Sequence, residues 1–515
     1  MPLPKAASLA LPVFLLLAPA ASALTAEELW AEAQRLTMEA GTTVTATARR
    51  QGDRLVLTDL VLAMGSPYDP VDLKLERITL QDRPDGSVAV LLPPTFPVTF
   101  NLGKAEPERG FVTLSTSAPG FSLVVADIGP RAAFDLQAPS LTVSLEKFVP
   151  APKPGEKVDF TFAVADLSLQ HRMDLTASSQ VATMSLQFGT LHSDLNVDVD
   201  GASDGAMSVD LSDVSVSLNV LVPSSLDDVD ARVDLEGENF LPYLLDVLSD
   251  GLTFKAGATH GPLAMMINVN DADRPKLVEV TSQLGRLNVG LDAAGISYDA
   301  VFGKTVTTIR GDFPEEEFQD FAMEVDEVAY GLRIGIGDLV TPQDVALTTR
   351  VTNLSLSPEV WAEIEPTGVL GSSPLSYGFD IAMRYALKPQ MLDPKWQLEP
   401  DTFPPVDIVD LTLNALNLEG FGVNLGGSGA ITFDESDLVT FPGFPVPEGK
   451  MSFTATGVNS LIDRLAAGGL IPLDEVTGLR MGLMFIAKVG KAPDSLVSEL
   501  EFRAKSFYLN GLKIR

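Results

Sequence analysis

Three residue types that build catalytic triads stand side by side at His192-Ser193-Asp194. A serine hydrolase needs its triad members to meet through the fold, with the histidine between the serine and the carboxylate. This stretch has the alternation of a β-strand, and neighbours on a strand point to opposite faces of the sheet. The tripeptide therefore predicts no triad.

A second pattern, Asp198-Val-Asp-Gly-Ala-Ser-Asp-Gly205, resembles the start of a calcium loop. A calcium loop of the EF-hand kind needs an oxygen ligand at its fifth position and a glutamate at its twelfth. Ala202 and Val209 stand there instead. We interpret the stretch as a carboxylate-rich hairpin turn.

Other residue types that support catalysis are scarce. The chain has no cysteine, which excludes disulfides, thiolate metal sites and cysteine nucleophiles. The glycines of 426–429 and 335–337 lack the lysine and the following helix of a phosphate-binding loop. Paired carboxylates could serve a glycosidase, but 69 acidic residues make any pairing uninformative. We predict no catalytic, cofactor-binding or metal-binding residue and no enzyme; this includes the three scattered histidines, His171, His192 and His260.

The first 23 residues have the three regions of a secretory signal peptide. Lys5 makes the start basic, residues 6–20 are apolar, and Ala21-Ser-Ala23 fits a cleavage site. We expect a periplasmic protein whose mature chain begins at Leu24. The alternative is an uncleaved inner-membrane anchor facing the periplasm, although this segment is short of the ~20 residues that span a bilayer. No later segment is long and apolar enough for an integral membrane protein.

The charge balance argues against two classes of partner. The chain holds 36 Lys and Arg against 69 Asp and Glu, a net charge of −33. Such a charge repels nucleic acid and anionic lipid headgroups. It equally serves to keep a β-rich protein in solution.

Periodicity predicts a helix followed by many strands. Thr25 and Glu28 form a capping box ahead of an apolar stripe that ends near Gly41. Apolar residues then alternate with polar ones, with a turn at 51–53 and a phase slip that predicts a bulge near Glu76-Arg77. The clearest stretch, 159–222, predicts an antiparallel meander with a turn at 201–205. Proline-rich breaks at 148–155 and 389–405 suggest regions 24–150, 151–388 and 389–515.

A unit of strand, short helix and strand recurs three times, each with an asparagine where the first strand ends. These asparagines are Asn239, Asn353 and Asn459. The predicted helices are 240–248, 358–364 and 461–467, and strands are predicted to follow at 252–257, 375–381 and 479–485. Chance similarity among hairpins is the alternative explanation.

The last unit carries a family resemblance. The segments TGVNSLIDRLAAGGLIP (456–472) and EFRAKSFYLNGLKIR (501–515) resemble the C-terminal part of the DUF2125 family of alphaproteobacterial envelope proteins. The segment DLTLNALNLEGFGVNLGGSGAITFD (410–434) is similar to the repeats of AsmA-like proteins, and the ending is also similar to that of YdgA-like proteins. The resemblance implies a periplasmic protein with a long curved sheet whose apolar face is a lipid path, and it implies no catalytic residue. AsmA-like proteins usually keep an N-terminal anchor, from which the cleavable signal departs.

We therefore expect a mainly β, elongated and curved antiparallel sheet built from weak strand, short helix and strand repeats, with an N-terminal helix. The function that we favour is a non-enzymatic, AsmA-like role in envelope biogenesis or lipid handling. The expected partners are a lipid or another apolar ligand and an envelope protein. One alternative is a structural or partner-binding scaffold without lipid, in which the apolar faces pack on each other. A carbohydrate-active enzyme on a β-solenoid is the more distant one.

Overall fold

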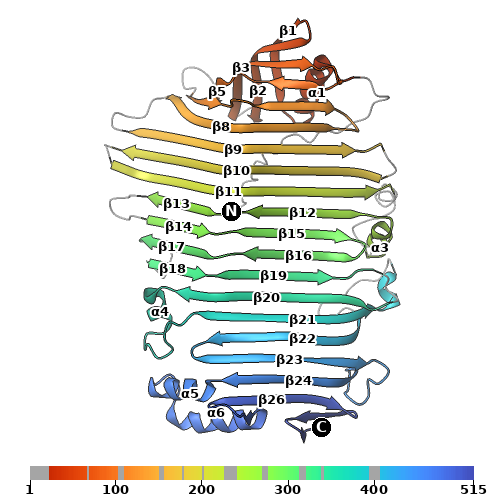
Figure 1. Cartoon of the computed structure of the whole chain (residues 1–515), viewed down its shortest axis with the longest axis vertical. Coiled ribbons are helices and arrows are strands. Elements are labelled where there is room, and N and C mark those ends of the chain that lie inside the picture. The colour runs from red at the N-terminus through yellow and green to blue at the C-terminus, as the bar shows by residue number, and fades with distance from the viewer. Residues whose placement is uncertain are drawn as a thin grey trace. The chain divides into compact units, whose positions relative to one another are not determined.

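The computed structural model describes residues 23–66, 69–102, 110–149, 156–176, 179–199, 202–224, 241–269, 276–311, 320–337, 341–393 and 406–515. Residues 1–22 of the predicted signal peptide, Asn239 and most of the two proline-rich breaks lie outside these residues. The fold is mainly β and its strand pairs are antiparallel, as predicted (Figure 1). The chain divides into two compact units, Met1–Leu221 with Ala264–Asp271 and Val222–Leu263 with Ala272–Arg515.

The first unit consists of one helix and most of the longest strands. Its elements are α1 (Ala26–Glu39), β1 (Thr43–Gln51), β2 (Arg54–Ser66), β3 (Asp69–Asp82), β4 (Val88–Leu91), β5 (Thr95–Leu102), β6 (Gly110–Ser117), β7 (Ser122–Asp127), β8 (Ala133–Val149), β9 (Lys157–Asp174), β10 (Ser179–Val199), β11 (Ala202–Pro223) and, apart from Leu263, β13 (Leu263–Val269).

Helix α1 begins at the predicted capping box. The Glu28 carboxylate accepts a hydrogen bond from the Thr25 amide at 2.9 Å, and the Glu28 amide donates to Thr25 Oγ1. Leu29 packs the helix onto a core that includes Leu57 and Val88, the largest side chains that are almost fully buried. The predicted turn at 51–53 joins β1 to β2, where Gly52 has the positive φ of +63° that favours glycine.

The bulge predicted near Glu76-Arg77 is in the neighbouring strand. The pairing of β2 with β3 keeps one register from Arg54 to Ser66, so β3 carries no extra residue there. Instead, the register of the β1–β2 pairing shifts between Thr45 and Thr47 of β1. At this point β2 carries Asp59, which has a φ of +55°. The apolar phase of β3 changes where its other neighbour changes from β5 to β4.

The predicted meander is β9, β10 and β11. Their strands run from Lys157 to Pro223, and the loop between β10 and β11 is shorter than predicted because β11 already begins at Ala202. Left-handed residues interrupt the alternation in β9 at Asp166 and in β11 at Asp213. In β9 the apolar residues have even numbers before Asp166 and odd numbers after it. Because the strand bends at Asp166, their side chains stay on one side of it.

The second unit continues with shorter strands and the remaining helices. Its elements are α3 (Leu241–Ser249), β12 (Thr253–His260), β14 (Lys276–Ser282), β15 (Gly285–Asp292), β16 (Gly295–Phe302), β17 (Thr305–Gly311), β18 (Asp320–Val325), β19 (Glu327–Ile334), β20 (Gln343–Leu356), α4 (Pro358–Ile364), β21 (Leu375–Leu387), a 3-10 turn η1 (Pro389–Leu392), β22 (Val406–Gly420), β23 (Val423–Asp434), β24 (Val446–Thr456), α5 (Val458–Ala467), α6 (Leu473–Ile486), β25 (Lys488–Val489), β26 (Ser495–Arg503), β27 (Ser506–Leu509) and β28 (Leu512–Lys513).

The predicted repeats are confirmed where they are described, with one exception. Helix α3 and strand β12, and the series β20, α4 and β21, match the prediction. Helix α5 matches as well, but Asn459 lies inside it rather than in the strand before it. The strand predicted at 479–485 is wrong, because these residues form helix α6. Leucine, methionine and arginine are strong helix formers, and this segment pairs with no strand that would override them.

Candidate functional site

His192 lies between two carboxylates and away from the adjacent serine. Its Nδ1 is 2.6 Å from Asp210 of β11, and its Nε2 contacts Asp194, two residues along the same strand. Ser193 lies opposite Phe162 in β9, on the other face of the sheet. The side-chain hydrogen bond with Asp210, aided by that with Asp194, raises the pKa of His192 above its usual value of 6.5. This geometry makes a surface ion pair and no nucleophile.

One hydrolase pattern was overlooked in the sequence. Gly201-Ala-Ser-Asp-Gly205 fits Gly-x-Ser-x-Gly, which in α/β-hydrolases is a sharp turn from a strand into a helix. Here Ala202 to Gly205 belong to strand β11, and no helix follows them in the described part of the chain before Leu241. The context of a nucleophile turn is missing. Within the described residues, no group of three or more His, Asp or Glu side chains is arranged to hold a metal ion.

The two histidines of unit 1, His171 and His192, are expected to have different pKa values. The His171 ring contacts Phe134 at a tilt of 31°, with ring centroids 5.0 Å apart, and its burial, together with the charge of Arg172, lowers its pKa. A raised pKa means that the ion pairs of His192 stabilise the fold fully below about pH 6.5 and are lost as the pH rises through the folded pKa. NMR titration should therefore place the midpoint of His192 above that of His171, and Asp210→Asn should lower only the former. The reverse order would contradict this geometry.

The most extensive surface feature of unit 2 is one face of its sheet. Seven neighbouring strands, β12, β15, β16, β19, β20, β21 and β22, pair in that order. Their register aligns two rows of apolar side chains, which we call the apolar face. It consists of Ala256, Val289, Tyr298, Leu332, Leu347, Ile381 and Leu413 in one row and of Phe254, Leu291, Ile296, Ile334, Val345, Met383 and Leu411 in the other.

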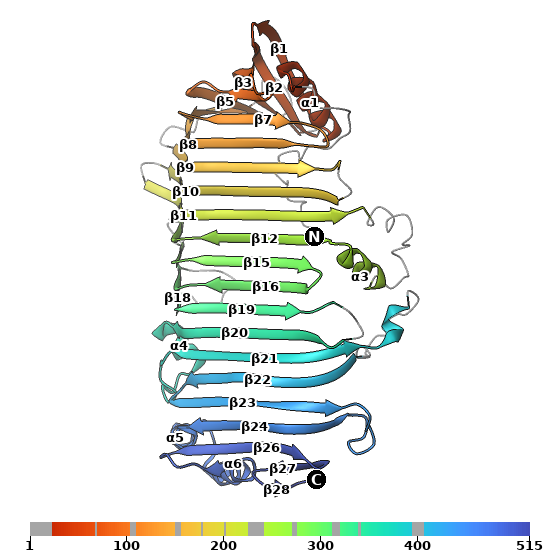
Figure 2. The ribbon, with the colours of Figure 1, turned by 45° about the vertical axis from the view of Figure 1, so that its right-hand side comes forward.

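The apolar face keeps much of its surface in contact with solvent. Phe254, Ile296, Tyr298 and Leu347 are between 37% and 40% exposed. In the part of the chain that the structure describes, these strands pack mainly on their neighbours in the sheet, and no helix packs extensively against them. Figure 2 shows the strands as a single layer. The face is thus not the interior of a sandwich.

The opposite face of the same strands is polar. Ion pairs follow one another across it: Lys255 lies 3.1 Å from Asp292, and Arg286 lies 3.1 Å from Asp299. Farther along, Arg350 pairs with Glu327 on the neighbouring strand. The difference between the faces follows from the two-residue period of a strand, which sends alternate side chains to opposite sides.

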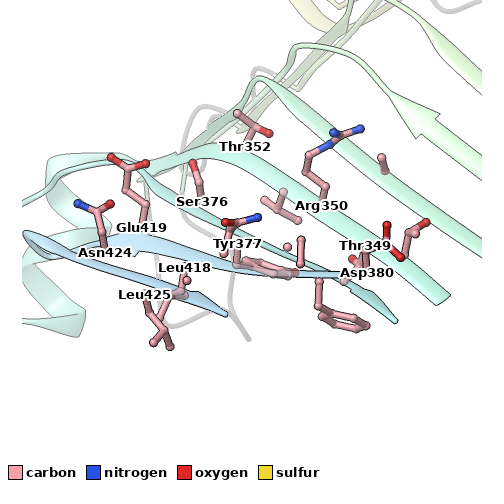
Figure 3. Close-up of a pocket in the computed structure, with 18 of the residues that line it drawn as sticks. Thr349, Arg350, Thr352, Ser376, Tyr377, Asp380, Leu418, Glu419, Asn424 and Leu425 are labelled. Atoms are coloured by element: carbon pink, nitrogen blue, oxygen red, sulfur yellow. The ribbon is translucent and has the colours of Figure 1, made fainter. Parts of the chain in front are cut away.

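A hollow of about 680 Å³ lies on the polar side of β19 to β24. Its lining includes the complete cross-strand row of Arg350, Gly378, Asn417, Gly426 and Thr454. In Figure 3 the polar Glu419 and Asn424 lie on one side of the strands, while Leu418 and Leu425 lie on the other. Hydroxyl, amide and carboxylate groups suit hydrogen bonds to a polar molecule. The hollow is therefore distinct from the apolar groove that the sequence predicts.

A bend at Asn353 places the apolar face on its inner side. Strand β20 pairs with β19 up to Thr352 and with β18 beyond it, and Asn353 between them has a φ of +53°. The Asn353 side chain donates to Asp326 Oδ2 at 2.7 Å, which fixes the point where β18 gives way to β19. Val325 and Val351, next to the bend, are among the most buried side chains of this unit. Apolar side chains of β18 and β20 are thus covered where the sheet bends.

The sequence reasoning missed most of this face. It singled out the alternation of 159–222 and 410–434, whereas five of the seven strands lie between 253 and 356. The alternation of Ile296, Tyr298 and Ala300 with Ser297 and Asp299 was the available signal.

Comparison of the chain with family models, curated proteins and solved structures gives no match. The resemblance to the DUF2125 family thus stays a prediction. None of the described helices combines the length and the apolar character needed to cross a membrane.

Proposed function

We propose that this chain is a non-enzymatic, AsmA-like periplasmic protein of the DUF2125 kind, which handles a lipid during biogenesis or maintenance of the cell envelope. The apolar face of unit 2 shelters the acyl chains from water. The protein acts passively, as a surface along which an apolar ligand lies. Export by the signal peptide at residues 1–23 puts it in the compartment where such ligands must cross water.

The observation that carries this proposal is the exposure of the apolar face. Fourteen apolar side chains form two uninterrupted rows across seven strands, and four of them, Phe254, Ile296, Tyr298 and Leu347, remain more than a third exposed. Contiguous apolar surface of this kind is rare on proteins without a ligand or partner. Each CH₂ group that an acyl chain buries there contributes about 0.8 kcal/mol.

The inner side of the bend supports a chain-like ligand. A flat apolar surface contacts an acyl chain on one side only, whereas a face that bends where β20 changes its pairing from β19 to β18 would contact it on two. The scaffold alternative needs the same face to be covered by protein. The two alternatives differ in what binds the purified chain.

Binding of a fluorescent fatty acid such as cis-parinaric acid tests the proposal. Its emission should rise when it binds the wild-type protein. Leu347→Asp puts a charge in the middle of the apolar face and should weaken binding by more than about tenfold, because a carboxylate does not desolvate against a hydrocarbon chain.

Thr348→Asp is the matched control. Thr348 is the next residue of β20, is exposed, and belongs to the polar face. This variant should bind like the wild type. Equal loss in both variants, or no binding by the wild-type protein, would rule out the apolar face as the site and leave the scaffold alternative.

A further inference from the structure

Helix α6 exposes apolar side chains that a protein surface seldom leaves in water. The most exposed ones form what we call the α6 surface, and their exposed fractions range from 54% to 83%. They are Leu473, Met481, Met484, Phe485 and Ile486 of the helix, together with Val489 of the adjoining β25. No residue of α6 is buried. Folding of the described residues therefore gains little from this helix.

Helix α6 is nevertheless held in a defined place. Arg480 donates to Asp463 of α5 at 2.5 Å, and the carbonyl of Ile486 accepts a hydrogen bond from Asn510 Nδ2 at 3.0 Å. Asn510 precedes β28, where Leu512 is also strongly exposed. Polar contacts in the middle and at the C-terminal end thus fix the helix while its apolar side chains stay exposed.

The charge around α6 is opposite to that of the whole chain. From the start of α6, residues 473–515 hold seven Lys or Arg and five Asp or Glu, whereas the chain as a whole has a net charge of −33. The basic residues are Arg480, Lys488, Lys491, Arg503, Lys505, Lys513 and Arg515. Lys488 and Lys491 directly follow the apolar end of the helix, and both are exposed.

We propose that the α6 surface binds to a lipid bilayer that carries anionic headgroups. Phe485 and Met484, at the C-terminal end of the helix, enter the boundary between headgroups and acyl chains. Lys491 and Lys513 contact the headgroup phosphates. The net charge of the chain repels such a bilayer, so the reversed local charge selects this part of the chain as the point of contact.

The pattern of charge favours a bilayer over a protein partner or a second copy. A second copy presents the same basic residues, so two α6 surfaces would bring like charges together. Anionic headgroups attract each nearby lysine, with a change in affinity of about fivefold per residue. This binding does not depend on whether the apolar face of unit 2 holds a lipid.

Flotation of the purified full chain with vesicles tests the proposal. The wild-type protein should float with phosphatidylcholine vesicles that contain phosphatidylglycerol, bind much less to phosphatidylcholine alone, and dissociate at high salt. Phe485→Asp should weaken binding by more than about tenfold, since it removes an inserted ring and adds a like charge. Lys491→Glu combined with Lys513→Glu should weaken it at least as much.

Two variants in unit 1 serve as controls. Met38→Asp changes an apolar side chain that is 66% exposed, and Lys157→Glu reverses an exposed charge. Both should bind vesicles like the wild type, and circular dichroism should show that all variants are folded. Failure of the wild type to float, or equal binding to both kinds of vesicle, would overturn the proposal. A dimer that Phe485→Asp dissociates, without vesicle binding, would assign the surface to a second copy. Parinaric acid binding reports on the apolar face alone and so separates the two proposals.

Discussion

Leu57→Ala is expected to lower the free energy of unfolding of unit 1 by about 2–5 kcal/mol. The Leu57 side chain is 1% exposed and packs in the core between α1 and its strands. Its truncation loses the transfer free energy of the removed groups and leaves a cavity that a rigid sheet cannot fill. Urea unfolding followed by the fluorescence of Trp30, which packs on the same core, measures the change.

Leu347→Ala is the matched comparison on the apolar face. Leu347 is 40% exposed, so the same truncation should cost less than about 1 kcal/mol, as surface substitutions do. Trp361, in helix α4 of the same unit, reports its unfolding. A cost close to that of Leu57→Ala would mean that protein covers the apolar face, and the lipid proposal would lose its main support.

Gly457→Ala should destabilise the C-terminal part of unit 2 by at least about 3 kcal/mol. Gly457 precedes α5 with a φ of +81°, and a Cβ atom there would lie 1.9 Å from the carbonyl oxygen of Gly422. The strain of a left-handed alanine, about 1–2 kcal/mol, then adds to the cost of shifting the backbone. Urea unfolding followed by Trp361 fluorescence should show the loss.

The backbone at Gly457 also positions the cap of α5. The Gly457 amide donates to the carbonyl of Asp494, whose carboxylate accepts from the amides of Asn459 and Ser460 at 3.0 and 2.9 Å. Burial alone would raise the pKa of Asp494, but the hydrogen bonds from Ser460 and Asn459 outweigh it and lower the pKa to about 2. A shifted backbone at Gly457 would break these bonds.

Gly443→Ala is the control for the conformational strain. Gly443 has the same φ of +81°, and nothing lies within 4 Å of the position of its Cβ. This variant should cost only about 1–2 kcal/mol. An equal loss in the free energy of unfolding of the two variants would show that backbone strain alone sets the cost and that the close approach of Gly422 adds nothing.

Helices and turns could be predicted from a few adjacent residues, whereas the apolar face depends on pairing between strands that are distant in the sequence. The capping box at Thr25 and the turn at Gly52 depend on a few adjacent residues, so the sequence is sufficient for both. The bulge opposite Glu76 was assigned to the wrong strand, because the apolar phase of β3 changes although its pairing with β2 keeps one register. The left-handed Asp59 has no signal in its own strand apart from its residue type.

The apolar face needs information that a single strand does not carry. Phe254 joins Leu291 and Ile334 in one row only through the order and register of β12, β15, β16 and β19. A shift of one residue in any of these pairings would move a whole set of side chains to the other face. Helix α6 was mistaken for a strand for a related reason. No residue of α6 is buried against the described residues. Its apolar residues therefore do not have the spacing of a buried helix face, and they do not have that of a strand either.

Native mass spectrometry of the protein purified from cells shows whether the apolar face of unit 2 holds a lipid. The apolar face of unit 2 is expected to retain lipid, so the wild-type chain should carry additional masses that fit envelope lipids. Leu347→Asp should remove these masses, while Thr348→Asp should keep them. A wild-type protein that is purified without lipid, and stays without lipid after incubation with envelope lipids, would contradict the account.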